Sequence, residues 1–474
     1  MTEKESRLTP LEQQRPLDVL ILAAGLGTRM KSQRAKVLHE LGGHPLIAHV
    51  TRKAHALDHQ KIYVVVGHQA ADVEAAVRRE LGRDADQAAF VVQKQQRGTG
   101  DAVMAAGKAL KDSDSTLLVL SGDVPMVRVE TLEKFVDFHR VSGAACSILS
   151  VKLDNPAGYG RMVRDATEGF ARIVEHRDAT PDEKLIREIN SGIYCFETTK
   201  LFSALNEIEP ANQQGEYYLT DVPAILGAAG ERIAIYLHQD AREVSGINTR
   251  ADLAEFENLL RRGTIRGLMM EGVTFIDPSH AYVSAEAQIG HDCVIYPNVS
   301  IEGDTVVGDG CVIRSGSRIT NSEIGTNVVI RDHCLIQDSK IGSNCTIGPF
   351  ANLHTNTRLE EGAAIGNFVE VKKSRMGRGS KAKHLTYLGD ATIGEQTNIG
   401  AGTITCNYDG KNKNETIIGD NVKIGSDTML VAPVTVGRGS ITAAGSVVTR
   451  DVPPDSLVAG VPAVVKKKLK NDDE

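Results

Sequence analysis

The sequence contains no tryptophan among its 474 residues, and aromatic residues of all kinds make up only 4% of the chain. It also lacks a run of about 18 apolar residues, which a membrane-spanning helix requires. Its seven cysteines include no C-x-x-C pair, so neither a disulfide framework nor a zinc knuckle is expected. Free cysteines are typical of a reducing compartment, and the polar first sixteen residues lack the apolar core of a secretory signal. We therefore expect a cytoplasmic protein without a membrane span.

A surplus of positive charge is missing as well, because 54 Lys and Arg stand against 61 Asp and Glu. The net charge of -7 gives no reason to expect nucleic acid as a partner. Glycine, in contrast, is abundant, with 45 residues, and predicts a chain that turns often. A hydrophobic share of 41% and a charged share of 24% are typical of folded domains, and the length favours two or three of them.

The first half of the chain alternates apolar strand-like runs with helical stretches. Strands are predicted at 17–23, 62–66 and 116–120, with a helix at 46–56. Strand, helix and strand in series indicate an α/β domain with a mostly parallel sheet. Ligands of such sheets collect at the carboxyl ends of the strands, where a glycine-rich loop and Asp123 both fall.

That loop reads LAAGLGTRM at residues 22–30, and Lys36 follows shortly after. A glycine-rich turn after a buried strand lets backbone N–H groups approach phosphates, and Arg29 and Lys36 add positive charge. A dinucleotide-binding G-x-G-x-x-G motif would need a third glycine where Met30 stands. The motif therefore favours a phosphate site of another kind.

From about Gly272 the chain becomes a repeat in which an aliphatic residue is followed by glycine, often at steps of six or multiples of six. This hexapeptide period predicts a parallel β-helix whose aliphatic residues point inward. Cys293 and Cys311, 18 residues apart, should stack in neighbouring coils as core residues. The segment NYDGKNKN at 407–414 should be a loop extruded from the coils. Five segments are predicted: a polar extension at 1–15, the α/β domain at 16–250, a linker helix at 251–271, the β-helix at 272–464 and a charged tail at 465–474.

The motifs of the first half occur in a recognisable order. AAGLGTRM and Lys36 are followed by Gln93, Gly98-Thr99, SGDVP at 121–125, GYGR at 158–161, IVEH at 173–176 and EINSG at 188–192. In this order they resemble the sugar-1-phosphate nucleotidylyltransferases. With the hexapeptide half, the chain resembles the bifunctional N-acetylglucosamine-1-phosphate uridyltransferases/glucosamine-1-phosphate acetyltransferases. The resemblance implies a Rossmann-like α/β domain, a left-handed parallel β-helix and a homotrimer.

The resemblance also implies both reactions. The β-helix would acetylate glucosamine 1-phosphate with acetyl-CoA, and the α/β domain would transfer a uridylyl group from UTP to N-acetylglucosamine 1-phosphate, giving UDP-N-acetylglucosamine, a precursor of peptidoglycan and lipopolysaccharide. Arg29 and Lys36 would hold the reacting phosphates, while Asp123 and Asn248 would bind Mg²⁺, which accepts oxygen ligands from protein, phosphate and water. The implied UTP- and sugar-binding residues are Leu22, Ala23, Ala24, Gly25, Lys36, Gln93, Gly98, Thr99, Ser121, Gly122, Asp123, Gly160, Glu175, Asn190 and Asn248.

In the β-helix half, the resemblance makes His384 the general base of acetyl transfer, a role that suits an imidazole near neutral pH. The implied ligands of the amino sugar phosphate are His354, Lys372, Tyr387, Asn398 and Lys413, and those of acetyl-CoA are Ala401, Asn407, Tyr408, Ser426, Ala444 and Gly460. Two of these positions depart from the family. His354 and Gly460 stand where the family has arginine, so each lacks a charge that would bind phosphate.

Other functions remain open. The chain could be a monofunctional sugar-1-phosphate nucleotidylyltransferase whose β-helix serves only oligomerisation. It could also be a non-catalytic scaffold, although Arg29, Lys36 and Asp123 argue against that. A γ-type carbonic anhydrase would need three histidines that converge on zinc, and His291, His333 and His354 show no shared face in the repeat.

Overall fold

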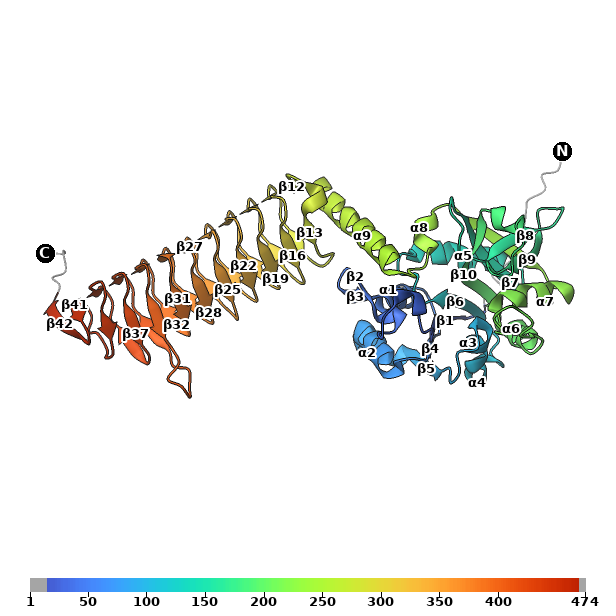
Figure 1. Cartoon of the computed structure of the whole chain (residues 1–474), viewed down its shortest axis with the longest axis horizontal. Helices are drawn as coiled ribbons and strands as arrows, with labels where there is room; N and C mark the ends of the chain where they lie inside the picture. The colour runs from blue at the N-terminus through green and yellow to red at the C-terminus, as the bar shows by residue number, and fades with distance from the viewer. Residues whose placement is uncertain (1–14, 469–474) are drawn as a thin grey trace, which may run out of the picture. The chain divides into compact units, whose positions relative to one another are not determined.

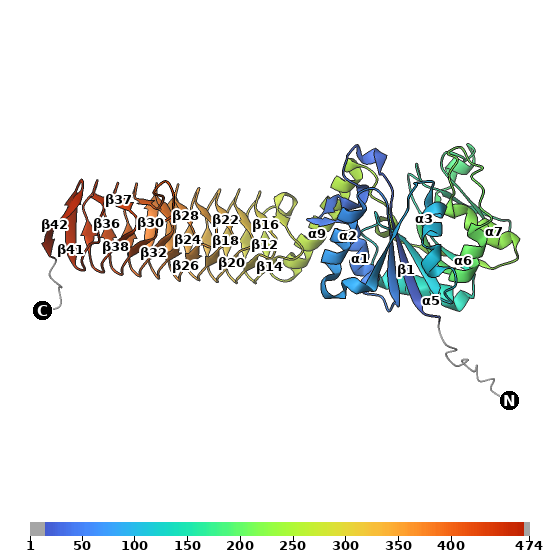
Figure 2. The ribbon, with the colours of Figure 1, turned by 90° about the horizontal axis from the view of Figure 1, so that it is seen from below.

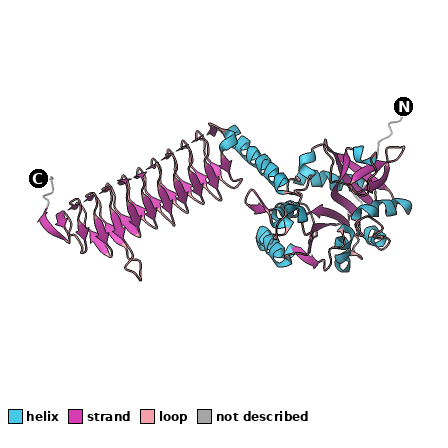
Figure 3. Ribbon diagram, viewed as in Figure 1, coloured by secondary structure: helices cyan, strands magenta, loops and turns pink. Residues whose placement is uncertain are grey.

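The computed structural model describes residues 15–468 and divides the chain into two compact units, Met1–Glu257 and Asn258–Glu474. The expected extension at 1–15 and charged tail at 465–474 therefore lie mostly outside the described residues. Figure 3 shows that helices are concentrated in the first unit, whereas the second unit is built almost wholly from short strands. The Rossmann-like α/β domain and the hexapeptide-repeat β-helix predicted from the sequence are both present.

The first unit is built around one mixed sheet with the order β11-β7-β10-β6-β1-β4-β5. Strands β6, β1, β4 and β5 are parallel to one another, whereas β10 runs antiparallel between β6 and β7. The strand bounds are β1 Leu17–Ala23, β4 Lys61–Val66, β5 Ala88–Val92, β6 Thr116–Ser121, β7 Cys146–Lys152, β8 Arg161–Arg164, β9 Phe170–Val174, β10 Glu188–Glu197 and β11 Ile233–His238. The predicted parallel strands are confirmed, and the antiparallel β10 is an addition to them.

Helices cover both faces of this sheet, as Figure 2 shows. Because side chains alternate along a strand, Val19 and Ile21 of β1 join one apolar cluster and Leu20 joins another. The first cluster draws on α1, α2 and α5, and the second on α3, α6 and α7. The helix bounds are α1 Leu46–His55, α2 Ala70–Leu81, α3 Thr99–Ala105, α4 Gly107–Leu110, α5 Val129–Ser142, α6 Thr198–Leu205, α7 Val222–Ala228 and α8 Ala241–Val244.

Helix α9, Arg250–Met270, is continuous over 21 residues and passes the boundary between the two units. Gly263 lies within the helix and does not interrupt it. In its second half, Ile265 and Leu268 are buried in the same apolar cluster as the first coils of the β-helix. Among residues 15–468, none of the helices is long and apolar enough to cross a bilayer.

The second unit is a three-sided parallel β-helix with sheets of 12, 10 and 9 strands, seen as a ladder of coils in Figure 1. Its strands run from β12 Thr274–Phe275 to β42 Ala463–Lys468, and most are two or three residues long. Each coil places an aliphatic residue above that of the previous coil, as in Ile295, Ile313 and Ile330. Because these side chains are fully buried, stacked aliphatic residues fill the core of a chain that has few aromatic residues.

The cysteines behave as the repeat predicts. Cys293 and Cys311 are fully buried and precede strands that pair in register, so they lie one coil apart. Each thiol donates to a backbone carbonyl of the following coil, Cys293 to Gly308 at 3.1 Å and Cys311 to Gly325 at 3.1 Å. They are structural core residues.

One coil is longer than the rest. Met376 pairs with Ile393, 17 residues along, but Ile393 pairs with Ile418, 25 residues along. The added residues form the loop at 407–414, which projects from the ladder in Figure 1 and is closed by a bridge between Tyr408 and Lys413. The extruded loop predicted from the sequence is therefore present, and the register of the coils continues beyond it.

Candidate functional sites

Two adjoining cavities open at the carboxyl ends of β1 and β6. The larger, with a volume of about 430 Å³, is lined by the glycine-rich loop, and the smaller, of about 210 Å³, lies towards β8 and β10. Predicted residues lining the larger cavity are Leu22, Ala23, Ala24, Gly25, Arg29, Lys36, Gln93, Gly98, Thr99, Ser121, Asp123 and Asn248. Gly160, Glu175 and Asn190 line the smaller one. Arg29, Asp123 and Asn248 line both, so two ligands bound side by side would meet there.

At this junction the charged groups of the loop and the strand ends converge. The Lys36 ammonium donates to Asp123 Oδ2 and, at 2.7 Å, to Asn248 Oδ1. Arg29 donates to the same Asn248 oxygen at 2.7 Å. Two cationic side chains and two side-chain oxygens thus share one small volume, where the cations could stabilise the charge of bound phosphate groups.

The oxygen ligands of this junction fit a magnesium ion. Asp123 and Asn248 both bind the single Lys36 ammonium, so their oxygens are close enough to share one cation. Carboxylate and amide oxygens are hard donors, and Mg²⁺ commonly takes only one or two from protein. Among residues 15–468 the structure shows no cluster of three or more His, Cys, Asp or Glu that could hold a metal by themselves. Phosphate and water would have to complete the coordination.

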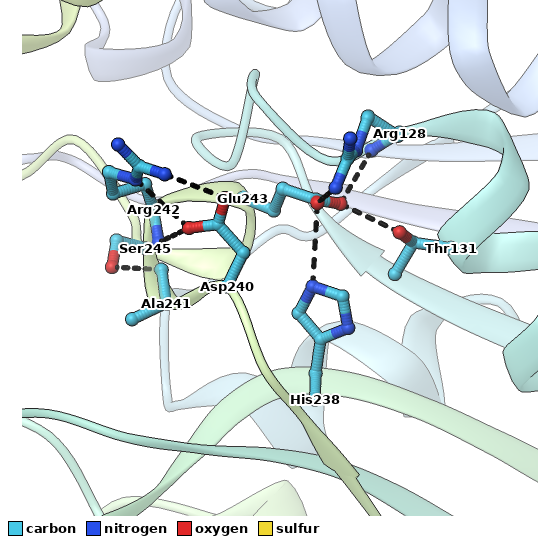
Figure 4. A network of polar contacts seen from close by, with 8 residues as sticks. All are labelled: Arg128, Thr131, His238, Asp240, Ala241, Arg242, Glu243 and Ser245. Carbon is cyan, nitrogen blue, oxygen red and sulfur yellow. Dashed lines mark hydrogen bonds and ion pairs between the residues drawn. The ribbon is translucent and has the colours of Figure 1, made fainter.

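A buried carboxylate, Glu243, lies between the segment that follows Asp123 and the segment that precedes Asn248, and Figure 4 shows its partners Arg128, Thr131 and His238. Glu243 accepts hydrogen bonds from the Arg128 guanidinium and from Thr131 Oγ1 at 2.7 Å, at the start of α5. His238 Nε2 lies 3.5 Å from the same carboxylate. Burial opposes ionisation of the Glu243 carboxyl, but hydrogen bonds from Arg128 and Thr131 outweigh it and its pKa lies below the ordinary value.

Two further contacts tie these contacts of Glu243, which we call the brace, to the junction. Ile247 N donates to Asp123 O at 2.9 Å, joining the two segments directly. The Lys53 ammonium donates to the carbonyl of Pro125, two residues after Asp123. Burial lowers the pKa of Lys53 to about 8. Glu243 and Lys53 line neither cavity, so we do not expect them to touch a ligand bound there.

The smaller cavity is shaped by close contacts around Gly160. A Cβ at this position would lie 3.1 Å from Ile173 Cγ2 and 3.4 Å from Glu175 Oε1, so a larger residue would press on the cavity wall. Glu175 accepts from Thr220 Oγ1 at 3.3 Å, and burial raises the pKa of its carboxyl. Asn190 donates to the Tyr194 hydroxyl at 2.6 Å. These groups form a polar pocket with both donors and acceptors.

Several lining residues were missed by the sequence analysis, namely Gln96 and Glu216 in the larger cavity and Tyr159, Tyr194, Thr220 and Gly246 in the smaller. The motif GYGR contains Tyr159, so motif membership was the only sequence signal for that residue, and the other five lie outside the motifs quoted above. Gly122, which was predicted to bind ligand, lines neither cavity. A Cβ there would lie 3.1 Å from both Ile47 Cδ1 and Leu22 O, so Gly122 permits close packing of β1 against β6.

In the β-helix, predicted residues gather on the outer face of the 10-stranded sheet. His354 ends β25 (Asn352–His354) and is in register with Lys372, which ends β28 (Glu370–Lys372). Tyr387 begins β31 (Tyr387–Gly389) in register with Glu370. The Asn407 amide donates to the Tyr387 hydroxyl at 3.5 Å. Because the strands are parallel, these side chains form one polar surface over successive coils.

His354 has a specific partner on this face. Its Nε2 lies 3.1 Å from Glu370 Oε1, and its Nδ1 lies 3.0 Å from Thr355 Oγ1. An imidazole held by a carboxylate therefore occupies the position where the family resemblance implies a guanidinium. Gly460 has a φ of 104° at the turn between β41 (Ser456–Gly460) and β42, where a side chain would be strained.

The remaining predicted residues lie along two edges of this face. His384 ends β30 (Lys381–His384), is exposed, and stands at the corner that leads into β31. Asn398 begins β33 (Asn398–Ile399), one coil beyond Lys381. Near the same corner, backbone hydrogen bonds stack the segments of Ala401, Ser426 and Ala444 on successive coils. Tyr408 and Lys413 lie in the extruded loop at the opposite corner, after β34 (Ile404–Cys406).

The corner that carries His384 also carries an apolar stack. The rings of His333, Phe350 and Phe368 are parallel, with centroids 5.1 and 5.4 Å apart, and Leu385 follows in the next coil. Phe350, Phe368 and Leu385 are 47%, 56% and 64% exposed, which is unusual for side chains of this kind in a row. We refer to His333, Phe350, Phe368 and Leu385 as the aromatic corner. His291, His333 and His354 do not share a site that could bind zinc. His291 contacts Glu271 O, His333 stacks on Phe350, and His354 contacts Glu370.

Comparison with known proteins agrees with this division. Residues 18–242 match the nucleotidyl transferase family, residues 278–361 match the GMPPB C-terminal domain, and residues 415–450 match six repeats of the bacterial transferase hexapeptide. The fold and these matches define a nucleotidyl transferase joined to a hexapeptide-repeat transferase.

Relatives similar along nearly the whole chain are named bifunctional protein GlmU. That of Syntrophomonas wolfei is 47% identical and covers 93% of this chain and 96% of its own. Those of Geobacillus sp. (strain WCH70) and Geobacter metallireducens are each 48% identical, over 92% and 97% of this chain and 94% and 99% of their own. The chain belongs to the GlmU family.

Proposed function

We propose that this chain makes UDP-N-acetylglucosamine in two steps, acetyl transfer in the β-helix followed by uridylyl transfer in the α/β unit. As a member of the GlmU family, it is an enzyme with both activities, and its substrates are a nucleotide and acetyl-CoA. The observation that supports uridylyl transfer is the pair of adjoining cavities, which could hold two substrates side by side. Both cavities are lined by Arg29, Asp123 and Asn248.

In the proposed uridylyl transfer, UTP occupies the larger cavity and N-acetylglucosamine 1-phosphate the smaller one. Arg29 and Lys36 bind the phosphates and orient the sugar phosphate oxygen towards the α-phosphorus of UTP. Mg²⁺ held by Asp123 and Asn248 would neutralise charge on the phosphates. Gly160, Glu175 and Asn190 bind the acetamido sugar, and Gln93 with the Gly98-Thr99 backbone binds the uracil. Pyrophosphate leaves as the new phosphoanhydride forms.

In the proposed acetyl transfer, Lys372, Lys413 and His354 bind the phosphate of glucosamine 1-phosphate, and Tyr387 and Asn398 bind its sugar. His384 accepts a proton from the amine as the nitrogen attacks the thioester carbonyl, and the thiolate of CoA leaves. Ala401, Ser426 and Ala444 present a strip of small residues along which acetyl-CoA would lie, and Asn407 and Tyr408 would also contact acetyl-CoA. Gly460 has no side chain and therefore provides no charge to bind the phosphates of acetyl-CoA.

We further propose a homotrimer in which neighbouring β-helices complete each acetyl transfer site. His384 and the loop that carries Lys413 stand on opposite edges of one face, so a single chain leaves the site open between them. The aromatic corner beside His384 supplies apolar surface for a second copy to cover. UTP and acetyl-CoA are metabolites of the cell interior, and the seven free cysteines suit that environment, so we propose a cytoplasmic location.

An assay of the purified chain tests both activities. Thiol release from acetyl-CoA with glucosamine 1-phosphate reports acetyl transfer, and pyrophosphate release from UTP with N-acetylglucosamine 1-phosphate reports uridylyl transfer. Activity in the second assay alone would support the monofunctional alternative.

A mixing experiment tests the shared site. His384→Ala and Lys413→Ala chains are each expected to be weak in acetyl transfer. If the two residues act from different chains, co-refolded mixtures should regain about one intact site in four by random assembly. Mixtures no more active than the separate variants would place both residues in one chain.

A further inference from the structure

The amide group of Gln93 is fixed in one orientation. Its Nε2 donates to Asp101 Oδ2 at 2.8 Å and to Gly98 O at 3.2 Å. An amide nitrogen has two hydrogens, and both of these acceptors can only accept. The Gln93 nitrogen therefore has no hydrogen left for a ligand, and the amide oxygen alone remains available to one.

Asp101 is itself held firmly. Its other carboxylate oxygen accepts from Arg97 at 2.7 Å, and the Arg97 guanidinium lies 5.3 Å from the centre of the Tyr217 ring. Asp101 also lies in the first turn of α3, where the helix dipole favours an acidic side chain. Gln93 and Asp101 are only 5% and 8% exposed, so water has little access to replace their contact. Gln93 lines the larger cavity, but Asp101 does not.

We infer that Asp101 is a specificity-determining residue that makes the larger cavity select a uracil base over a cytosine base. The inference rests on the proposed binding of the UTP base by Gln93. Uracil carries a hydrogen on N3 and donates it, whereas cytosine N3 carries a lone pair and accepts. A fixed amide oxygen binds the first and repels the second, so the cavity excludes the wrong base as well as binding the right one.

This assignment explains why a carboxylate, and not an amide, is useful at position 101. An amide at 101 could donate to the Gln93 oxygen and so permit the Gln93 group to rotate by half a turn. The Gln93 nitrogen would then face the cavity and could donate to cytosine N3. Asp101 acts through Gln93 and touches no ligand, so it is a positioning residue.

The test compares UTP with CTP as substrates of the full-length protein carrying Asp101→Asn. We expect the ratio of kcat/KM for UTP to that for CTP to fall by up to about tenfold, because only the contact with Gly98 O would then favour the present orientation of the Gln93 amide. Asp101→Ala, which removes the acceptor without adding a donor, should reduce the ratio less. If turnover of CTP is too slow to follow, the competitive inhibition constant of CTP against UTP gives the same ratio.

Asp112→Asn serves as the matched control, since Asp112 is exposed and follows α4. The substitution removes one negative charge, as Asp101→Asn does. An unchanged UTP to CTP ratio in both Asp101 variants, even with weaker binding of both nucleotides, would overturn the inference and leave Asp101 a structural residue. Failure of the parent protein to use UTP at all would instead overturn the proposed function. If Asp101→Asn does not fold, the ratio measured with Asp101→Ala decides the question.

Discussion

The two units bring distant residues together in different ways. In the α/β unit, Lys36, Asp123 and Asn248 come from three segments far apart in the sequence, which meet at the edge where β1 and β6 end. In the β-helix, His354 and Lys372 meet because each is a fixed distance along a repeat, with one coil stacked on the next. The first site is enclosed within its own unit, whereas the second is spread over a face and its two edges.

Because of this difference, the two sites depend on different parts of the structure. The site in the α/β unit depends on the tertiary packing of its own unit, including the brace formed by Glu243. The acetyl transfer site that we propose depends on coil register and on a second chain. Mutations should therefore affect one activity without the other, and the first two predictions below test that independence.

The largest effect is expected for Asp123→Ala, which removes one proposed magnesium ligand and the partner of Lys36. Loss of charge stabilisation worth several kcal/mol should reduce pyrophosphate release by about 10³-fold or more, while thiol release from acetyl-CoA stays at the parent level. Asp137→Ala, at an exposed position in α5, is the control. Parallel loss of both activities in a folded variant would contradict two independent sites.

A somewhat smaller effect is expected for His384→Ala. Removal of a general base should lower kcat of acetyl transfer by about 10²- to 10⁴-fold and leave uridylyl transfer intact. His291→Ala, in an earlier coil, controls for the loss of an exposed imidazole. A kcat close to that of the parent would show that another group takes the proton.

A more modest change is expected for His354→Arg. The guanidinium can bind phosphate with two parallel donors, whereas the imidazole already shares Nε2 with Glu370. The KM for glucosamine 1-phosphate should therefore fall about tenfold, the value of one charge-assisted hydrogen bond. Steady-state kinetics measure this change, with His291→Arg as the control. The same KM in parent and variant would mean that His354 does not face the substrate phosphate.

The smallest effect is expected for Glu243→Gln, which keeps the shape of the brace but removes its charge. Because Arg128 is largely exposed, we expect a loss of only about 1–2 kcal/mol in the free energy of unfolding at pH 7. The pKa of the Glu243 carboxyl is lowered in the folded state, so its contribution is present above the ordinary glutamate pKa and disappears as the pH falls through the folded value. The difference between parent and variant should therefore shrink towards pH 4 and below.

Urea unfolding followed at 222 nm measures this difference, since most helices lie in the α/β unit. Glu133→Gln, at an exposed position of α5, is the control. A difference that stays constant from pH 7 to pH 4 would mean that the Glu243 charge does not stabilise the brace.

Local patterns were enough to predict much of the fold. The run LDVLILA predicted β1 at its observed bounds, Leu17–Ala23, because a strand buried on both faces is continuously apolar. The hexapeptide period predicted the stacking of Cys293 on Cys311 and the loop at 407–414. In these cases the information lies within one element or one repeat.

Features that depend on distant contacts could not be predicted. Strand β10 lies antiparallel between β6 and β7, an order that no local pattern specifies. Glu243 binds Arg128 from 115 residues away, and nothing in the neighbourhood of either residue indicates the pair. The contact between His354 and Glu370 lies between these two cases. Their separation is close to one coil length, so the repeat alone could have identified them as neighbours in adjacent coils.

The last strand of the β-helix has a consequence for solubility. A ladder of short parallel strands ends in a row of unpaired N–H and C=O groups, on which another β-helix could continue the ladder. Here β42 turns back to pair antiparallel with β41, so the final strand runs against the direction of the preceding coils. It also carries Lys466, Lys467 and Lys468, which are exposed. Reversed direction and like charges at this edge oppose end-to-end growth into fibres, so the chain protects the terminus of its own repeat.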